Sequence, residues 1–130
     1  MKILIVDDEA PARRRLRRQL EALGYTDIVG EAADGVAACA RIEELRPELV
    51  FLDINMPNLD GMGVATQAAD TPAIVFVTAF DEFAIRAFEV GAVDYVLKPV
   101  SSERLAITLE RVVAALAVNC LLYTSPSPRD

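Results

Sequence analysis

The residues of this chain that could do chemistry stand where short apolar runs end. Two adjacent aspartates follow the first run, and a third aspartate, a threonine and a lysine each follow a later one. In chain order these residues are Asp7-Asp8, Asp53, Thr78 and Lys98. Three carboxylates, a hydroxyl and an ammonium group, once gathered in space, would form a site for a divalent metal ion and a phosphoryl group.

The apolar runs themselves predict how these residues are gathered. The runs at 3–6, 49–52, 74–77 and 95–97 are continuous, which is typical of parallel strands buried on both faces. The carboxyl ends of parallel strands emerge at one edge of the sheet, where ligands bind. We therefore expect the candidate residues to converge at that edge.

Strand and helix signals alternate along most of the chain. Strands are predicted at 2–6, 28–32, 48–52, 73–77 and 93–97. Helices are predicted at 10–23, 34–45, from the loop at 55–61 to about 69, at 81–90 and at 101–118, with Ser101 or Ser102 as the last cap. These strand–helix units predict an α/β fold with a doubly wound sheet.

The composition indicates one domain and excludes several kinds of function. Of the 130 residues, 53% are hydrophobic, and the net charge of −7 disfavours non-specific nucleic-acid binding. No apolar run approaches the roughly 20 residues of a membrane span, and no signal-peptide pattern opens the chain, so a cytoplasmic location is predicted. Histidine is absent, which excludes histidine metal sites, serine–histidine catalysis and an internal phosphohistidine.

Two segments depart from the general pattern. The arginines of Arg13–Arg18 are interpreted as the solvated face of an amphipathic helix, with partner docking as the alternative. Residues 119–130 show no helical periodicity, and Pro126 and Pro128 would break a helix. We predict an irregular segment there, either a non-native end or the start of a linker, after a domain at 1–118.

The carboxylates are expected to hold Mg²⁺. Side chains of adjacent residues in extended backbone point apart, so at most one of Asp7 and Asp8 would bind the ion directly while the other acts through water. Asp53 would supply the third carboxylate, and Asn55 could present its backbone carbonyl. Because the ion relieves repulsion among the acids and neutralises an incoming phosphoryl group, Asp53 can act as a nucleophile and form an aspartyl phosphate.

Two further residues are suited to bind the phosphoryl oxygens. Lys98 offers a point charge, and the hydroxyl of Thr78 can donate a hydrogen bond. The Lys98-Pro99 bond is a candidate for the cis form, although cis is the minority state of such bonds.

Two other functions on a similar fold fit the residues poorly. An aspartate-nucleophile phosphatase would place its nucleophile after the first strand, with a second aspartate two residues later. A flavin- or nucleotide-binding module would need a Gly- or Ser/Thr-rich phosphate loop at that place. Here the first strand is followed by Asp-Asp-Glu-Ala-Pro, which would repel phosphate without a metal ion.

The combined motifs resemble the receiver domain of two-component response regulators. They are Ile-Val-Asp-Asp-Glu at 5–9, Leu-Asp-Ile-Asn-Met-Pro at 52–57 with Asp60-Gly61, Val-Thr-Ala at 77–79 and Tyr-Val-Leu-Lys-Pro at 95–99, and the likeness covers about residues 1–116. The resemblance implies a flavodoxin-like (βα)5 sheet with strand order 2-1-3-4-5. It also implies a role for each site residue: Asp53 as phosphoacceptor, Asp7 and Asp8 as the acid pair, Lys98 as the phosphate-binding lysine, and Thr78 and Tyr95 as switch residues.

The same resemblance implies partners. A sensor histidine kinase would donate the phosphoryl group to Asp53 with Mg²⁺ bound, and the domain would not be a turnover enzyme. The new charge would draw Thr78 inward and let Tyr95 fill the vacated space. The face formed by the fourth helix, fifth strand and fifth helix would then change, which biases homodimerisation.

A finer resemblance concerns the output of the signal. Asp-Glu-Ala-Pro-Ala-Arg at 8–13 and the segment 78–99 are similar to receivers attached to LytTR-type DNA-binding domains. In that subfamily the output domain follows the receiver, so we expect a fragment of a transcriptional regulator whose missing part contacts DNA. A stand-alone receiver that signals by protein contact is the alternative.

Overall fold

A parallel sheet runs through the residues that the computed structural model describes, which are 1–56, 59–67 and 72–124. Its strands are β1 (Ile3–Val6), β2 (Ile28–Ala32), β3 (Leu49–Leu52), β4 (Ala73–Thr78) and β5 (Asp94–Leu97). Their order across the sheet is β2-β1-β3-β4-β5, and every neighbouring pair is parallel. The predicted flavodoxin-like α/β fold and its strand order are confirmed.

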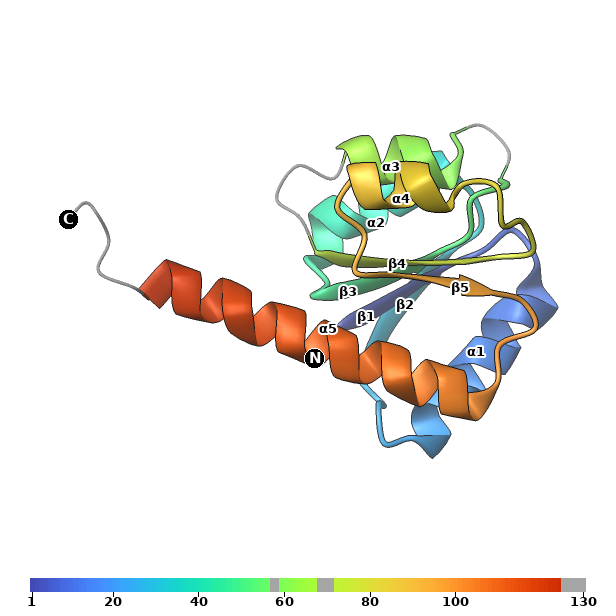
Figure 1. Cartoon of the computed structure of the whole chain (residues 1–130). Coiled ribbons are helices and arrows are strands. Elements are labelled where there is room, and N and C mark those ends of the chain that lie inside the picture. Colours follow the sequence, from blue (N-terminus) through green and yellow to red (C-terminus); the bar gives the residue numbers. More distant parts are fainter. Residues whose placement is uncertain (57–58, 68–71, 125–130) are drawn as a thin grey trace.

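Helices cover both faces of this sheet. They are α1 (Ala10–Ala22), α2 (Gly35–Leu45), α3 (Gly61–Gln67), α4 (Ala84–Glu89) and α5 (Ser102–Thr124). Figure 1 shows α1 and α5 on one face, and α2, α3 and α4 on the other. This arrangement leaves the loops after the strands together at the carboxyl edge.

The continuous apolar runs divide their side chains between the two layers. In β1, Ile3 and Ile5 pack into the core beneath α1 and α5, whereas Leu4 and Val6 pack into the core on the opposite face. In β3, Phe51 follows the first pattern and Leu52 the second. Because strand side chains alternate, a strand covered on both faces needs apolar residues at every position.

Most predicted helix ends are present in the structure. Pro11 lies in the first turn of α1, and the carboxylate of Asp34 caps α2 by accepting a hydrogen bond from the Ala37 N–H at 2.8 Å. The hydroxyl of Ser101 accepts from the Arg104 N–H at 3.1 Å, which makes Ser101 the cap of α5. These short polar side chains satisfy N–H groups that the first helical turn leaves without partners.

Some boundaries differ from the sequence expectation. Helix α4 begins at Ala84, three residues after the predicted start at Asp81. Helix α5 continues to Thr124, so the prediction of an irregular chain from 119 is wrong as far as 124. The first proline of the tail is Pro126, and a residue before proline avoids helical backbone, so nothing interrupts the helix earlier. The predicted loop at 57–58, the predicted helix end at 68–69 and the tail at 125–130 lie outside the described residues.

Candidate functional site

The predicted site residues come from four strands that are neighbours in the sheet. Asp7 follows β1, Asp53 follows β3, Thr78 ends β4 and Lys98 follows β5. The ladder of backbone hydrogen bonds continues past the strand ends: Asp53 N–H donates to the Val6 carbonyl at 3.0 Å, and Lys98 N–H to the Thr78 carbonyl at 2.8 Å. The backbone therefore fixes the lateral spacing of these residues.

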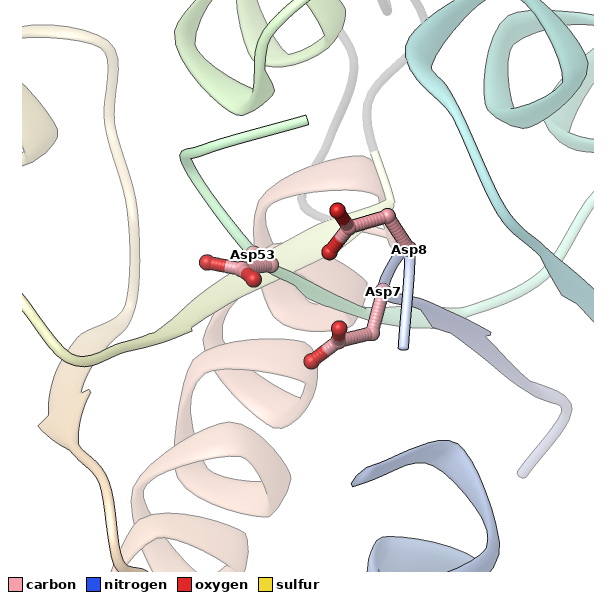
Figure 2. A group of neighbouring side chains, drawn as sticks. All are labelled: Asp7, Asp8 and Asp53. Carbon is pink, nitrogen blue, oxygen red and sulfur yellow. The ribbon is translucent and has the colours of Figure 1, made fainter. Parts of the chain in front are cut away.

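Three carboxylates gather at this edge. Asp7, Asp8 and Asp53 each offer an oxygen, and these oxygens lie within 4.8 Å of one another (Figure 2). Asp7 and Asp53 are buried and Asp8 is exposed. The chain bends at Asp8, so strict strand alternation no longer applies there, and both Asp7 and Asp8 offer a carboxylate oxygen to the cluster.

Lys98 joins two of the acids. Its Nζ lies 2.8 Å from Oδ2 of Asp7 and 3.4 Å from Oδ2 of Asp53. Burial alone would lower the pKa of Lys98, but the hydrogen bond to Asp7 and the charges of both carboxylates outweigh burial and raise it. Lys98 is therefore an ammonium group at neutral pH, and it reaches Asp53 from the end of β5, two strands away from β3. The Lys98-Pro99 peptide bond is cis, as the sequence suggested.

Asp53 carries a charge that its surroundings only partly neutralise. Burial raises the pKa of Asp53, and the nearby carboxylate of Asp7 raises it further. Lys98 and a hydrogen bond from the backbone of Asn55 act in the opposite direction, yet the net shift is upward. A divalent cation among the three carboxylates would supply the missing positive charge, so the donor set fits such an ion.

Thr78 and Tyr95 form hydrogen bonds with the same loop residue. The hydroxyl of Thr78 is fully buried and accepts a hydrogen bond from the Phe80 N–H at 3.3 Å. The hydroxyl of Tyr95 donates to the carbonyl of the same Phe80. The Tyr95 ring also lies beside Phe76, with ring centroids 6.3 Å apart. The two predicted switch residues thus contact one short segment after β4.

A glycine lets the chain return closely to Asp53, and sequence reasoning missed this role. A Cβ atom added to Gly61 would lie 2.3 Å from the backbone oxygen of Asp53. The Gly61 N–H donates to the Ile54 carbonyl at 2.9 Å, which closes the loop at this point. The Asp60-Gly61 pair was visible in the sequence, but only the fold reveals what the glycine faces.

Other contacts near the site were also missed. Arg13 donates from Nη1 to the backbone oxygen of Asp7 at 2.6 Å. Arg13 and Arg17 each form an ion pair with Glu31 of β2, at 2.9 Å in both cases. These two arginines therefore fix α1 against β2 instead of simply facing solvent, whereas Arg14 is exposed.

A polar cluster links β5 to α5. The guanidinium of Arg104 binds both carboxylate oxygens of Asp94, at 2.8 and 3.0 Å, and the Thr108 hydroxyl and Arg111 also contact this carboxylate. Burial would raise the pKa of Asp94, but the hydrogen bonds from Arg104, Thr108 and the Tyr95 N–H outweigh it and lower the pKa to about 2. The residue beside Tyr95 is therefore fixed to α5.

No described helix combines the length and the apolar character needed to cross a membrane.

The match to known proteins extends over most of the chain. The transcriptional regulatory protein BtsR of Salmonella typhi is 47% identical to this chain over 114 residues. The match covers 86% of this chain and 48% of BtsR. The positive alginate biosynthesis regulatory protein of Pseudomonas aeruginosa is 45% identical over 130 residues, which cover 97% of this chain and 52% of that protein. The chain thus spans about half the length of these relatives.

Among solved structures, the response regulatory domain of protein mrkE from Klebsiella pneumoniae superposes with a TM-score of 0.82 at 36% identity. That match covers 88% of this chain and 97% of the mrkE domain. Residues 3–110 match the family described as the response regulator receiver domain. With the sheet order and the acidic edge described above, these matches place the chain in the response regulator receiver domain family.

Proposed function

We propose that this domain accepts a phosphoryl group on Asp53 from the phosphohistidine of a sensor histidine kinase. The observation that carries the proposal is the contact of Lys98 with Asp53, at 3.4 Å, inside a cluster of three carboxylates whose oxygens lie within 4.8 Å of one another. A buried carboxylate beside an ammonium group, with room for a cation among the acids, is suited to phosphoryl transfer, which depends mainly on positioning and charge.

The residues of the cluster have separate roles in this reaction. Asp7, Asp8 and Asp53 would hold Mg²⁺ through carboxylate oxygens, and Asn55 through its backbone carbonyl. When bound, Mg²⁺ supplies the positive charge that offsets repulsion among the acids and the phosphoryl oxygens. A carboxylate oxygen of Asp53 attacks phosphorus, the bond from phosphorus to the donor nitrogen breaks, and an acyl phosphate forms.

Lys98 keeps the phosphoryl group in place after transfer. Its ammonium group already contacts Asp53 and needs only a small shift to bind a phosphoryl oxygen. The domain promotes its own modification in this way and undergoes one transfer per activation, so it is not a turnover enzyme.

The conformational switch starts at Thr78. Its hydroxyl moves from the Phe80 N–H toward the phosphoryl group, and Tyr95 then leaves the Phe80 carbonyl and turns into the vacated space. The fixed link from Asp94 to Arg104 passes the rearrangement of β5 to α5. The phosphoryl group thereby shifts the population between two states.

The phosphorylated domain passes its signal to other proteins and to a domain outside this chain. The relatives are about twice as long, and two are described as regulatory proteins of transcription or of alginate biosynthesis. We assign the missing part a DNA-binding role of the LytTR type. Ile85 and Phe88 of α4 and Leu97 of β5 are exposed, which supports homodimerisation through α4, β5 and α5 (Figure 1).

Intact-mass measurement with a small phosphodonor such as phosphoramidate tests the proposal. A single phosphoryl adduct is expected in Mg²⁺ and not in excess chelator. The Asp53→Asn variant should give no adduct, whereas Asp81→Asn, at an exposed aspartate outside the cluster, should react like the wild type. An adduct that persists in Asp53→Asn, or none under conditions where another receiver reacts, would contradict the assignment.

A further inference from the structure

A cavity of about 440 Å³ lies under α1, where that helix meets the segment between β5 and α5. Its lining includes Phe51 and Val77 of the sheet, Ala12 and Leu16 of α1, and Val100 before α5. Its volume falls within the range of about 300–1,000 Å³ that is typical of small-molecule sites. An apolar hollow of this size favours a ligand with an apolar body.

A hydrogen bond joins two residues of the cavity lining. The side-chain amide of Gln19 donates to the Val100 carbonyl at 2.8 Å and so ties α1 to the segment after β5. Both residues line the cavity. Because this hydrogen bond fixes two parts of the lining relative to each other, binding a ligand requires less ordering of the protein, which lowers the cost of binding.

The charged residues of the lining add up to one positive charge. Asp7 and Lys98 belong to the lining, but they pair with each other at 2.8 Å. Arg15, which also lines the cavity, is exposed and takes part in none of the ion pairs of the described residues, unlike Arg13 and Arg17. The solvent side of the cavity therefore presents a guanidinium group without a carboxylate partner.

From these features we propose that the cavity is a binding site for a small apolar molecule with a single negative charge. The apolar body contacts Leu16, Phe51 and Val100, and the anionic group pairs with Arg15. An inorganic phosphate does not fit this lining, because most of its surface would lose water without gaining hydrogen bonds. A cation of similar shape would face Arg15 unfavourably.

An NMR titration of the whole chain with octanoate, without Mg²⁺ or a phosphodonor, tests the proposal. Saturable shifts are expected for the Ala12 and Leu16 amides and for the methyl groups of Val100. Neutral 1-octanol should bind at the same place about threefold more weakly, as expected for the loss of a partly exposed ion pair. Shifts that do not saturate, or that map to another face, would overturn the proposal.

Matched variants separate the two parts of the recognition. Arg15→Gln should weaken octanoate about threefold and leave octanol unchanged, whereas Arg14→Gln, at an exposed arginine outside the lining, should change neither. Ala12→Leu fills the cavity and should weaken both ligands about tenfold or more. Equal effects of Arg15→Gln and Arg14→Gln would exclude the proposed charge recognition. Since no phosphoryl transfer is involved, failure here leaves the test of Asp53 unaffected.

Discussion

Asp53 occupies a position that is unfavourable for its own charge. It is 7% exposed, and the carboxylate of Asp7 lies in the same cluster. Lys98 is closer to Asp7, at 2.8 Å, than to Asp53, at 3.4 Å. Asp53 is therefore the less compensated of the two buried acids, which suits the proposed binding of a cation and a phosphoryl group and comes at some cost in stability.

Replacing this carboxylate by an amide should stabilise the domain when no metal ion is present. Asp53→Asn removes the repulsion from Asp7, and we expect the melting temperature to rise by about 2–6 °C. The folded state raises the pKa of Asp53 above its ordinary value of 3.8. The wild type therefore loses stability as the pH rises from this ordinary value through the raised pKa of the folded state. The advantage of the variant should therefore shrink as the pH falls toward that pKa.

Thermal unfolding in chelator, at several pH values, provides the measurement. Asp81→Asn is the control at an exposed position and should melt like the wild type. Added Mg²⁺ should stabilise the wild type more than Asp53→Asn, since a ligand that binds the folded state more tightly stabilises it more at the same concentration. A less stable Asp53→Asn in chelator would contradict this account of the charge balance.

The sequence predicted which side chains meet at the carboxyl edge of the sheet but not how they pair. Asp7, Asp53, Thr78 and Lys98 could be placed at one edge because each stands at the end of an apolar run. The sharing of Lys98 between two carboxylates depends on the lateral spacing of β1, β3 and β5, which no local pattern contains. The bend that brings Asp8 to the cluster is equally a property of the folded loop.

At the scale of elements, the loop from β3 to α3 depends on Gly61. Gly61→Ala would place a methyl group 2.3 Å from the Asp53 carbonyl, against backbone that cannot easily move. We expect a loss of about 1–3 kcal/mol in the free energy of unfolding, as for other overpacked sites. Phosphorylation of Asp53 should slow as well, because the displaced backbone belongs to the proposed acceptor residue.

Gly63→Ala is the matched control for this substitution. There the nearest atom to an added Cβ is Cδ1 of Leu59, the end of a flexible side chain, at 2.4 Å. A side chain can rotate away, and alanine favours helix by about 1 kcal/mol over glycine, so the variant should stay close to the wild type. Urea unfolding compares the two, and equal losses would show that close approach to Asp53 is not the cause.

Asp94 fastens β5 to α5 through its charge. The pKa of this carboxylate is about 2 instead of 3.8, so its stabilising effect is present above the ordinary pKa and lost as pH falls toward 2. Asp94→Asn should cost about 1–2 kcal/mol near neutral pH, a figure reduced for solvent screening because Arg104 and Arg111 are 34% and 55% exposed.

Urea unfolding of wild type and variant at a series of pH values checks this effect. The difference between them should narrow steadily as the solution is acidified below about pH 4. Asp27→Asn, at an exposed aspartate, should show no comparable pH dependence. A difference that is independent of pH would mean that the carboxylate acts through packing and not through its charge.

The elements differ in how well the sequence predicted them. The central strands β1 and β3 are fully buried, and their unbroken apolar runs predicted them well. Strand β2 lies at the edge and is mostly half-buried, so its Ile-Val-Gly-Glu-Ala segment gave a weaker signal. The amphipathic periodicity that predicts α5 ends near residue 118, whereas the helix itself continues to Thr124.

For the whole molecule, the exposed apolar residues of α4 predict an effect on assembly. With beryllofluoride and Mg²⁺ as a phosphoryl mimic, we expect the domain to dimerise in sedimentation experiments. Phe88→Glu should raise the dimer dissociation constant about tenfold or more, since loss of a central apolar anchor commonly costs over about 1 kcal/mol.

Val36→Glu is the control for a general effect of surface charge. Val36 is 61% exposed on α2, away from the proposed interface, and its replacement should leave dimerisation unchanged. Phosphorylation of Asp53 should be normal in both variants, because neither residue lies at the acidic edge. Equal dimerisation of Phe88→Glu and wild type would exclude α4 from the interface.

The order of strands across the sheet has a consequence for how activity is lost. The four strands that carry site residues, β1, β3, β4 and β5, are consecutive neighbours, and hydrogen bonds such as that from Lys98 N–H to the Thr78 carbonyl continue between their ends. Partial opening anywhere across this span would separate Asp53, the proposed acceptor, from Asp7, Thr78 and Lys98. We therefore expect phosphorylation of Asp53 to be lost at the same denaturant concentration as the far-ultraviolet circular dichroism signal of the helices. Phosphorylation would then report on cooperative unfolding of the entire sheet.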